Sequence, residues 1–173
     1  TVAAAAVGRD AAPALGILQA GADGAIQAFC EKPGDSPDLD SLVASPKLLA
    51  QQGIRADSPR WLASMGIYVF EPDVLHRLLE NTDHQDFGAD VLPDALRSCK
   101  VVAHPFSGYW RDIGTIRSLY EANISLCQSD PPFDFYEPQW PLYTRSRSLP
   151  PNHIVRSDIR DSLVVEGCKI TGA

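Results

Sequence analysis

Residues 61–70 read WLASMGIYVF, an almost uninterrupted apolar run. Its Ile, Tyr, Val and Phe residues are typical of a buried central strand. Pro72 follows closely, and proline suits the first turn of a helix because its missing N–H group would have no helical partner there. Leucine and valine residues over 74–79 then form one apolar helical face. A buried strand followed by an amphipathic helix predicts an α/β layer architecture.

The sequence on either side of this run predicts further strands and helices. Asp23-Gly24 separates two strand-like runs and indicates a β-hairpin. Thr115 suits the N-cap of a helix over 116–127, whose apolar residues recur with the spacing of a packed helix. The other expected elements are strands at 1–6, 16–20, 25–29 and 101–106 and a helix at 89–97.

The character of the sequence changes at Ser129. Prolines and aromatic residues fill 131–151, and so many prolines exclude a regular helix. We expect an extended segment there, held on neighbouring surfaces by its rings. Val164 and Ile170 lie six residues apart among small residues, the spacing of a hexapeptide β-helix repeat. So few repeats predict that the chain stops within that domain.

Composition and charge restrict the class of protein. The chain has 173 residues, of which 45% are hydrophobic and 21% charged, and its formal net charge is −7. This charge argues against binding to nucleic acid or to an anionic membrane, because both need a basic surface. No run approaches the roughly 20 apolar residues that cross a bilayer. The four cysteines lack CxxC spacing, which predicts reduced thiols and a cytoplasmic protein.

The first candidate site is Glu31-Lys32-Pro33, where the proline ends a predicted strand. The lysine ammonium carries three donors and suits a phosphate monoester. The neighbouring carboxylate can accept hydrogen bonds from sugar hydroxyls. These residues therefore fit a sugar phosphate, although, taken alone, they fit a solvated turn at a strand end better.

A second candidate lies in GYWRDIGT, residues 108–115. Asp112 stands just before a glycine and the predicted N-cap, where a strand gives way to a helix, and ligands of open α/β sheets bind at the carboxyl ends of strands. A single aspartate there can hold Mg²⁺, which takes one or two carboxylates together with substrate phosphates. The alternative is that Asp112 only caps the helix while Trp110 packs.

Two further segments are candidates for ligand contact. Ser64 and Gly66 interrupt the apolar run, and glycine within a strand often marks the close approach of a ligand or of another backbone. The serine hydroxyl would then bond to that ligand, but a small packing residue fits equally well. Asp86-Phe87-Gly88 fits a loop with an N-capping aspartate.

Taken together, these segments resemble glucose-1-phosphate adenylyltransferases over essentially the whole chain. EKP and GYW-D-GT also occur in related uridylyl-, thymidylyl- and guanylyltransferases, whereas SMGIYVF, DFG and the aromatic run before Leu-Pro-Pro are particular to the adenylyl enzymes. The matching stretches are FCEKP (29–33), ASMGIYVF (63–70), DFG-D-LP (within 86–93), GYWRDIGT (108–115), YEANISL (120–126) and FDFYEPQWPLYTRSRSLPP (133–151).

The resemblance implies a reaction that joins ATP and α-D-glucose 1-phosphate into ADP-glucose and pyrophosphate, in glycogen or starch synthesis. It implies part of an α/β, Rossmann-like layered nucleotidyltransferase domain over 1–128. Residues 129–173 would be an extended linker and the start of a left-handed parallel β-helix. The implied cofactor is Mg²⁺, and the implied assembly is a homotetramer regulated by small metabolites.

The same resemblance implies the site residues. Lys32, on the sugar phosphate, and Asp112, on the metal, are the implied catalytic residues. We expect these two side chains to converge on one cleft. The implied glucose 1-phosphate pocket consists of Gly16, Glu31, Lys32, Ser64, Tyr68, Asp86, Phe87 and Trp110.

The sequence departs from the family pattern in one respect. It contains no Gly-rich loop of the form G-G-x-G-x-R-L-x-P-L-T, which holds the triphosphate in the family, and no second metal aspartate upstream. We therefore expect an incomplete portion of the enzyme that is inactive alone. Base-reading residues would lie in the absent part, so UTP, dTTP or GTP as substrate stays an alternative. A non-catalytic regulatory subunit is a third interpretation, against which the retained Lys32 and Asp112 argue.

Overall fold

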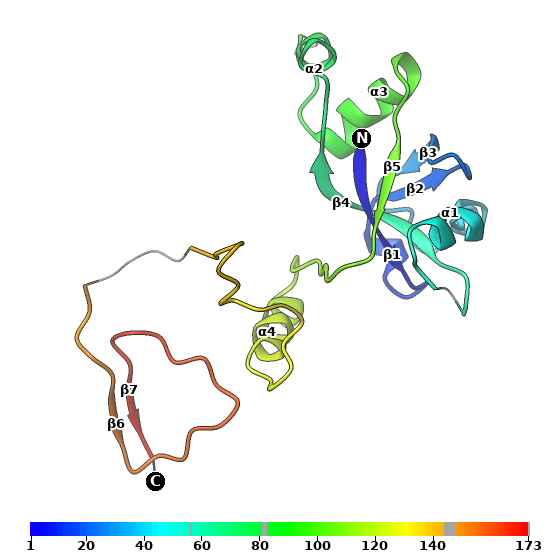
Figure 1. Ribbon diagram of the computed structural model, residues 1–173. Coiled ribbons are helices and arrows are strands. Elements are labelled where there is room, and N and C mark those ends of the chain that lie inside the picture. The colour runs from blue at the N-terminus through cyan, green and yellow to red at the C-terminus, as the bar shows by residue number, and fades with distance from the viewer. Residues whose placement is uncertain (56, 81–82, 144–147, 173) are drawn as a thin grey trace. The chain divides into compact units, whose positions relative to one another are not determined.

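The computed structural model describes residues 1–55, 57–80, 83–143 and 148–172. The chain divides into two compact units, Thr1–Trp110 and Arg111–Ala173, each of which can be followed by its colours in Figure 1. The first unit contains every predicted site residue except Asp112, which belongs to the second.

A five-stranded sheet forms the centre of the first unit. Its strands are β1 (Val2–Val7), β2 (Ile17–Ala20), β3 (Ile26–Cys30), β4 (Trp61–Tyr68) and β5 (Ala103–Phe106), in the spatial order β3-β2-β4-β1-β5. Strands β1 and β5 run parallel, and the other neighbours are antiparallel (Figure 1). The apolar run at 61–70 thus supplies the middle strand, as predicted, and the fold is mixed α/β.

The predicted hairpin joins β2 to β3. The Asp23 carboxylate accepts a hydrogen bond from the Ala25 backbone N–H at 3.1 Å, and Gly24 has a φ of 80°, which glycine adopts without steric cost. The Asp-Gly prediction is therefore confirmed. The hairpin pairs Ile17 with Cys30, so the residues just beyond this pair, 16 and 31, come to lie across from each other.

The central strand β4 is buried only over its first part. Residues 61–63 are buried, whereas Ile67 is 54% exposed, so the prediction of a buried central strand is confirmed only for its first part. The register between β4 and β1 shifts between Ser64 and Tyr68, where β4 carries extra residues and bulges. Gly66 lies in this bulge with a φ of 71°; beyond it Ile67 is exposed, while Tyr68 packs against the core.

Helical segments cover both faces of the sheet. They are η1 (Ala12–Ala14), η2 (Pro37–Leu42), α1 (Pro46–Gln51), α2 (Pro72–Leu79), the π-helical turn η3 (Phe87–Val91) and α3 (Leu92–Ser98). Leu18 and Leu62 belong to one apolar cluster with residues of α1, α2 and α3, and their neighbours Ile17 and Ala63 belong to a second cluster with residues of η2. This division follows from strand geometry, because successive side chains point to opposite faces.

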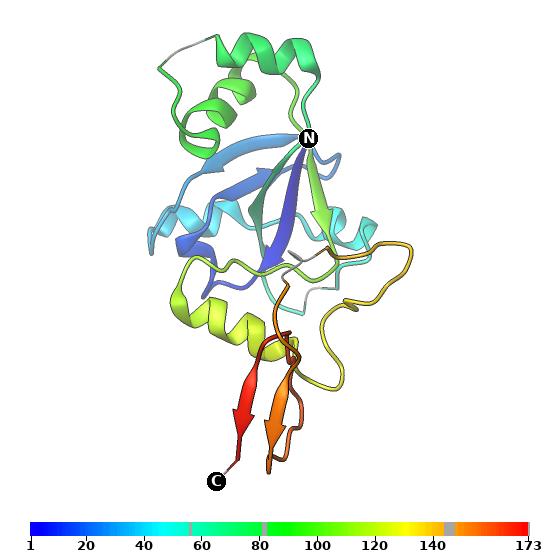
Figure 2. The same ribbon diagram turned by 90° about the vertical axis from the view of Figure 1, so that its left-hand side faces the viewer.

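Both helices predicted in the first unit are present. Helix α2 begins at Pro72, and Figure 2 shows it next to α3 near the start of β1. The predicted helix at 89–97 is divided into the turn η3, which is capped by Asp86, and α3, which has Pro93 in its first turn. Among the residues that the structure describes, no helix combines the length and the apolar character needed to cross a bilayer.

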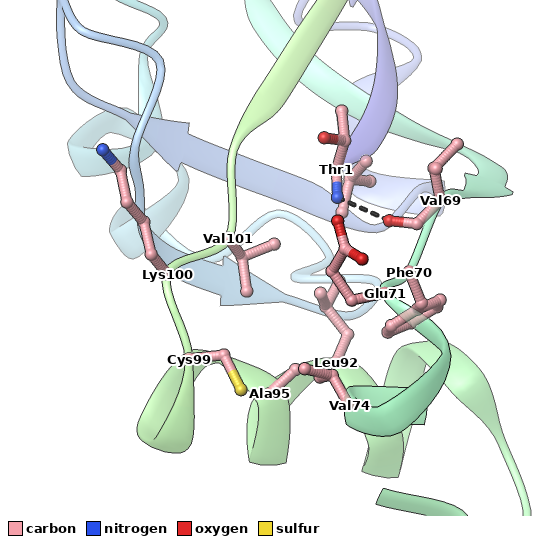
Figure 3. Close-up of a pocket in the computed structure, with 11 residues that line it drawn as sticks. Thr1, Val69, Phe70, Glu71, Val74, Leu92, Ala95, Cys99, Lys100 and Val101 are labelled. Carbon is pink, nitrogen blue, oxygen red and sulfur yellow. Dashed lines mark hydrogen bonds between the residues drawn. The ribbon is translucent and has the colours of Figure 1, made fainter. Parts of the chain in front are cut away.

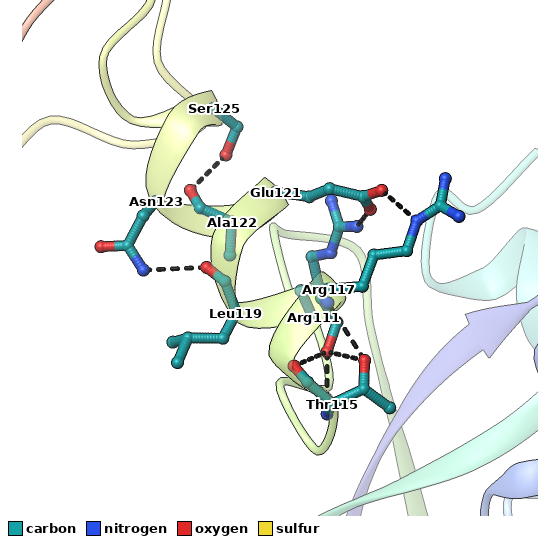
Figure 4. A network of polar contacts seen from close by, with 9 residues as sticks. Arg111, Thr115, Arg117, Leu119, Glu121, Ala122, Asn123 and Ser125 are labelled. Carbon is teal, nitrogen blue, oxygen red and sulfur yellow. Dashed lines mark hydrogen bonds and ion pairs between the residues drawn. The ribbon is translucent and has the colours of Figure 1, made fainter.

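In the second unit, helix α4 (Ile116–Ser125) begins after the predicted N-cap Thr115. The Thr115 hydroxyl accepts a hydrogen bond from the Ser118 N–H at 3.0 Å, and the Ser118 hydroxyl accepts one from the Thr115 N–H at 3.1 Å (Figure 4). The helix has no buried residue, and Ile116 is 90% exposed. The described residues of this unit leave the apolar face of α4 uncovered, so its packing stays a prediction.

The described residues after α4 include a pair of strands. Strands β6 (His153–Val155) and β7 (Lys169–Thr171) are parallel, with His153 opposite Lys169. The described residues of 129–152 form no helix or strand, as the prolines predict. Phe133 and Phe135 contact each other at a centroid distance of 5.1 Å, and Trp140 is 80% exposed. The expected attachment of this segment to neighbouring surfaces stays a prediction.

Candidate functional site

Glu31 and Lys32 form the first part of the candidate site, immediately after β3. Lys32 has a φ of 46°, in the left-handed region that residues other than glycine rarely enter. Its backbone N–H donates to the Leu15 carbonyl oxygen at 3.2 Å. The Lys32 side chain is 70% exposed, and its Nζ lies 3.7 Å from Glu31 Oε1. The turn therefore presents an ammonium and a carboxylate side by side.

Gly16 lies between Glu31 and Ser64. A Cβ atom at position 16 would stand 2.7 Å from Glu31 Oε2 and 2.8 Å from the ring of Phe29, so a glycine leaves the room that the carboxylate occupies. The Gly16 carbonyl oxygen accepts a hydrogen bond from the Ser64 backbone N–H at 2.8 Å. Through this residue, the start of β2 brings together two segments that are far apart in the sequence.

An aromatic group continues the site from Ser64. The Ser64 and Tyr68 hydroxyl oxygens are 3.4 Å apart, which is longer than a strong hydrogen bond between hydroxyls. Tyr68 stacks on Phe87 with ring centroids 5.7 Å apart and an interplanar angle of 18°. Phe70 lies beside both rings, at centroid distances of 6.2 and 6.1 Å. Phe87 is exposed, so the stack presents one edge to solvent.

Two carboxylates close the turn at 85–90 that carries Phe87. Asp86 Oδ1 accepts a hydrogen bond from the Ala89 N–H at 2.7 Å. Asp90 Oδ2 accepts from the backbone N–H groups of Gln85 and Asp86 at 2.9 and 3.0 Å. These backbone hydrogen bonds, that from Gln85 first, lower the pKa of Asp90, because they stabilise its ionised form.

Gly88 connects this turn to Glu31. A Cβ atom at position 88 would stand 3.0 Å from Glu31 Oε2 and 3.2 Å from Asp86 Oδ1, so the turn approaches the Glu31 carboxylate closely. The structure thus brings together most of the predicted site residues in a group that we name the Glu31 cluster. Its members are Gly16, Glu31, Lys32, Ser64, Tyr68, Asp86 and Phe87.

The Glu31 cluster offers distinct groups to a ligand. The Lys32 ammonium suits a compact anion such as a phosphate. The Glu31 carboxylate and the hydroxyls of Ser64 and Tyr68 can pair with sugar hydroxyls. The Tyr68–Phe87 stack provides an apolar wall beside them. The cluster therefore combines groups whose chemistry fits a phosphorylated sugar.

Trp110 lies in a different part of the first unit. With Phe106 and Arg55 it lines an open hollow of about 340 Å³. None of the residues that line this hollow belongs to the Glu31 cluster. The expected role of Trp110 at the glucosyl group stays a prediction.

Asp112, in the second unit, lies in a loop that is fixed on both sides. Arg111 pairs with Glu121 of α4, Arg117 donates to the same carboxylate at 2.8 Å, and Thr115 is held by its capping box (Figure 4). The hydrogen bond from Arg117, with a smaller effect of Arg111, lowers the pKa of Glu121. The predicted convergence of Asp112 with Lys32 concerns two separate units and stays a prediction.

The residues around Asp112 fit Mg²⁺ only as part of a ligand set. The Asp112 side chain is exposed and lies over Gly114, where a Cβ atom would stand 3.1 Å from Asp112 Oδ2. The described residues contain no group of three or more His, Cys, Asp or Glu side chains able to hold a metal. One carboxylate still suits Mg²⁺, which completes its octahedron with substrate phosphates and water.

A cavity of about 250 Å³ lies between the start of β1 and helices α2 and α3 (Figure 3). Its walls are mainly apolar, with Val74, Leu92 and Val101 among them. The backbone nitrogen of Thr1 donates to the Val69 carbonyl oxygen at 2.7 Å at its edge (Figure 3). The cavity contains none of the predicted site residues, but Phe70 of its wall lies beside the rings of Tyr68 and Phe87.

Three residues of the site had no role assigned from the sequence: Phe70, Gly88 and Asp90. In the sequence, Phe70 and Gly88 stood out only as members of longer motifs. Their contacts are with residues that are distant in the sequence, so local patterns did not indicate them. Asp90 carried a local signal, because a carboxylate four residues after a capping aspartate can reach back to the start of a turn. Spacing alone did not distinguish this contact from an exposed helical carboxylate.

The comparison with protein families accords with this geometry. A family model described as nucleotidyl transferase matches residues 1–129. The match includes the five-stranded sheet, the Glu31 cluster, Asp112 and α4. Since it spans well over half of the residues, the chain belongs to the nucleotidyl transferase family.

Proposed function

We propose that this protein transfers AMP from ATP to α-D-glucose 1-phosphate, giving ADP-glucose and pyrophosphate. Membership of the nucleotidyl transferase family supports nucleotidyl transfer in general. The observation that supports the sugar phosphate is the Glu31 cluster, in which Gly16 links the Glu31-Lys32 turn to the segment of Ser64. The motifs SMGIYVF and DFG favour the adenylyl branch of the family.

In the proposed reaction, a phosphate oxygen of glucose 1-phosphate attacks the α-phosphorus of ATP in line, and the bond to the departing pyrophosphate breaks. Lys32 holds the attacking phosphate and offsets part of its charge. Glu31 accepts hydrogen bonds from the sugar hydroxyls and orients the ring. Bound Mg²⁺ would neutralise charge on the ATP phosphates, and Asp112 would be one of its ligands. Positioning and charge neutralisation thus account for most of the catalysis.

The same proposal covers the second unit and the assembly. In a parallel β-helix each coil lays its strand beside the corresponding strand of the next coil, in parallel. The pairing of His153 with Lys169 in β6 and β7 has this form and supports the start of a left-handed β-helix. The resemblance supports a homotetramer that small metabolites regulate.

Substitution of Lys32 tests the proposed function. In the full-length protein, Lys32→Ala should raise the KM for glucose 1-phosphate at least tenfold, because a charge-assisted contact contributes about 1.5–3 kcal/mol. The KM for ATP should stay unchanged. Lys47→Ala, at another exposed lysine of the same unit, is the matched control. Equal increases in both KM values would remove Lys32 from this role.

Two further measurements test the nucleotide and the metal. In a panel of ATP, UTP, dTTP and GTP we expect ATP to give the highest kcat/KM, and a clear preference for another nucleotide would overturn the adenylyl assignment. Asp112→Asn should shift the Mg²⁺ dependence of the rate to higher concentrations. An unchanged rate and Mg²⁺ dependence would count against Asp112 as a ligand.

A further inference from the structure

Gly88 and Asp90 are not members of the Glu31 cluster, but both belong to the turn at 85–90. Gly88 lies close to the Glu31 carboxylate, and Asp90 accepts two backbone hydrogen bonds within the turn. We infer that they are positioning residues: the turn that Asp90 closes holds Gly88 beside the Glu31 carboxylate and thereby sets where that carboxylate meets the sugar. This inference rests on the proposed function, because it assigns the carboxylate to the sugar.

Asp90 fixes the conformation of the turn. Its Oδ2 accepts two backbone N–H groups at the start of the helical segment, and such groups have no partner within a helix. Asp86 accepts the Ala89 N–H in return, so each carboxylate ties one end of the turn to the other. The pKa of Asp90 is lowered by these bonds, which agrees with a carboxylate that is held in its ionised form.

The missing side chain of Gly88 leaves room for the Glu31 carboxylate, whereas the backbone conformation at this position does not require glycine. It is not among the glycines with positive φ, so an alanine there would meet no backbone strain. A Cβ would instead stand 3.0 Å from Glu31 Oε2, closer than ordinary van der Waals contact. Glu31 ends in a flexible, partly exposed carboxylate, which can move away. Gly88→Ala is therefore expected to keep the fold and to displace the carboxylate.

The test is a double-mutant cycle between Gly88 and Glu31 in the full-length protein, measured as steady-state ADP-glucose synthesis. Gly88→Ala should raise the KM for glucose 1-phosphate about tenfold, the loss expected for one charge-assisted hydrogen bond, with the KM for ATP and the kcat nearly unchanged. In a Glu31→Ala background, Gly88→Ala should add nothing, because no carboxylate remains to be moved. Ala89→Ser, a small change one residue along the same turn, is the control.

Asp90→Asn tests the same turn by a second route. It keeps an acceptor oxygen but removes the charge, so it should raise the KM for glucose 1-phosphate less than Asp90→Ala does. Asp94→Asn removes a carboxylate from the next turn of the same helical segment and should leave this KM unchanged. If Gly88→Ala abolishes the cooperative thermal transition, Asp90→Asn in the Glu31→Ala background decides in its place.

The outcomes separate this inference from the proposed function. If Glu31→Ala leaves the KM for glucose 1-phosphate unchanged, the sugar assignment of Glu31 fails and the inference falls with it. If Glu31→Ala raises this KM and Gly88→Ala does not, the inference alone is overturned. An equal increase from Gly88→Ala with and without the Glu31 carboxylate would also overturn it, because the effect would then not pass through Glu31.

Discussion

The ring of Phe87 stacks on the ring of Tyr68, with centroids 5.7 Å apart and planes inclined by 18°. Tyr68 ends the central strand β4, and Phe87 begins the turn η3. The contact therefore joins the sheet to the turn that approaches Glu31. Offset aromatic pairs contribute about 0.5–1.5 kcal/mol beyond the area that they bury, so this contact is a measurable part of the site's rigidity.

Removal of the stack should lower stability by a small, defined amount. Phe87→Leu is expected to reduce the free energy of unfolding by about 1 kcal/mol, whereas Phe87→Tyr keeps the ring and should change it little. Urea unfolding at equilibrium measures both. In a Tyr68→Leu background the cost of Phe87→Leu should become smaller, and an unchanged cost would show that the rings do not interact energetically.

Local signals in the sequence predicted the elements that carry the site. The Asp23-Gly24 turn, the start of α2 at Pro72 and the N-cap Thr115 all formed as expected. Each depends on a few adjacent residues, because turn and cap preferences arise from the local backbone and its nearest side chains. The middle strand β4 was predicted for the same reason, from its β-branched and aromatic run.

Features that depend on distant contacts were not predicted. The exposed Ile67 near the end of β4 accompanies a register shift against β1, which depends on the pairing of two distant segments. Most residues of the Glu31 cluster were candidates from the sequence itself, and Gly16 and Tyr68 were added through the resemblance. Their mutual placement depends on how β2, β3, β4 and the turn at 85–90 come together. The spacing of these residues in the sequence does not indicate how the segments come together.

The left-handed backbone of Lys32, at a φ of 46°, predicts a conflict between stability and binding. A residue with a Cβ in this region costs about 1–2 kcal/mol, and glycine avoids that cost but loses about 0.5–1 kcal/mol of unfolded-state entropy. Lys32→Gly should therefore be about 0.5–1 kcal/mol more stable than Lys32→Ala, measured by urea unfolding. Both variants should bind glucose 1-phosphate equally poorly, since both lack the ammonium. If Lys32→Gly were less stable than Lys32→Ala, the expected backbone strain at position 32 would be contradicted.

The two parts of β4 should respond differently to truncation. Leu62 is fully buried in the larger apolar cluster, so Leu62→Ala should cost about 2–5 kcal/mol of unfolding free energy. Ile67, exposed beyond the bulge, provides the matched control on the same strand, and Ile67→Ala should cost less than about 1 kcal/mol. The fluorescence of the buried Trp61 reports unfolding of this unit. Equal costs would mean that the end of β4 is covered in solution.

The depressed pKa of Asp90 fixes the sign of a pH dependence. Hydrogen bonds from the Gln85 and Asp86 N–H groups favour the carboxylate in the folded protein, and His84 acts in the same direction. A group whose folded pKa is lowered contributes stability that is fully present above its unfolded pKa, about 3.9 for aspartate. That contribution is lost as the pH falls through the folded pKa.

The wild-type protein should accordingly exceed Asp90→Asn in unfolding free energy between about pH 5 and 7, since the carboxylate is ionised in both folded and unfolded chains there. Below about pH 4 the unfolded chain takes up a proton that the folded turn resists, and the difference should shrink. Urea midpoints of both proteins across this range measure it. A difference that widens in acid would mean that the protonated carboxyl is the form stabilised by the turn, and the hydrogen-bond assignment of Asp90 would then be wrong.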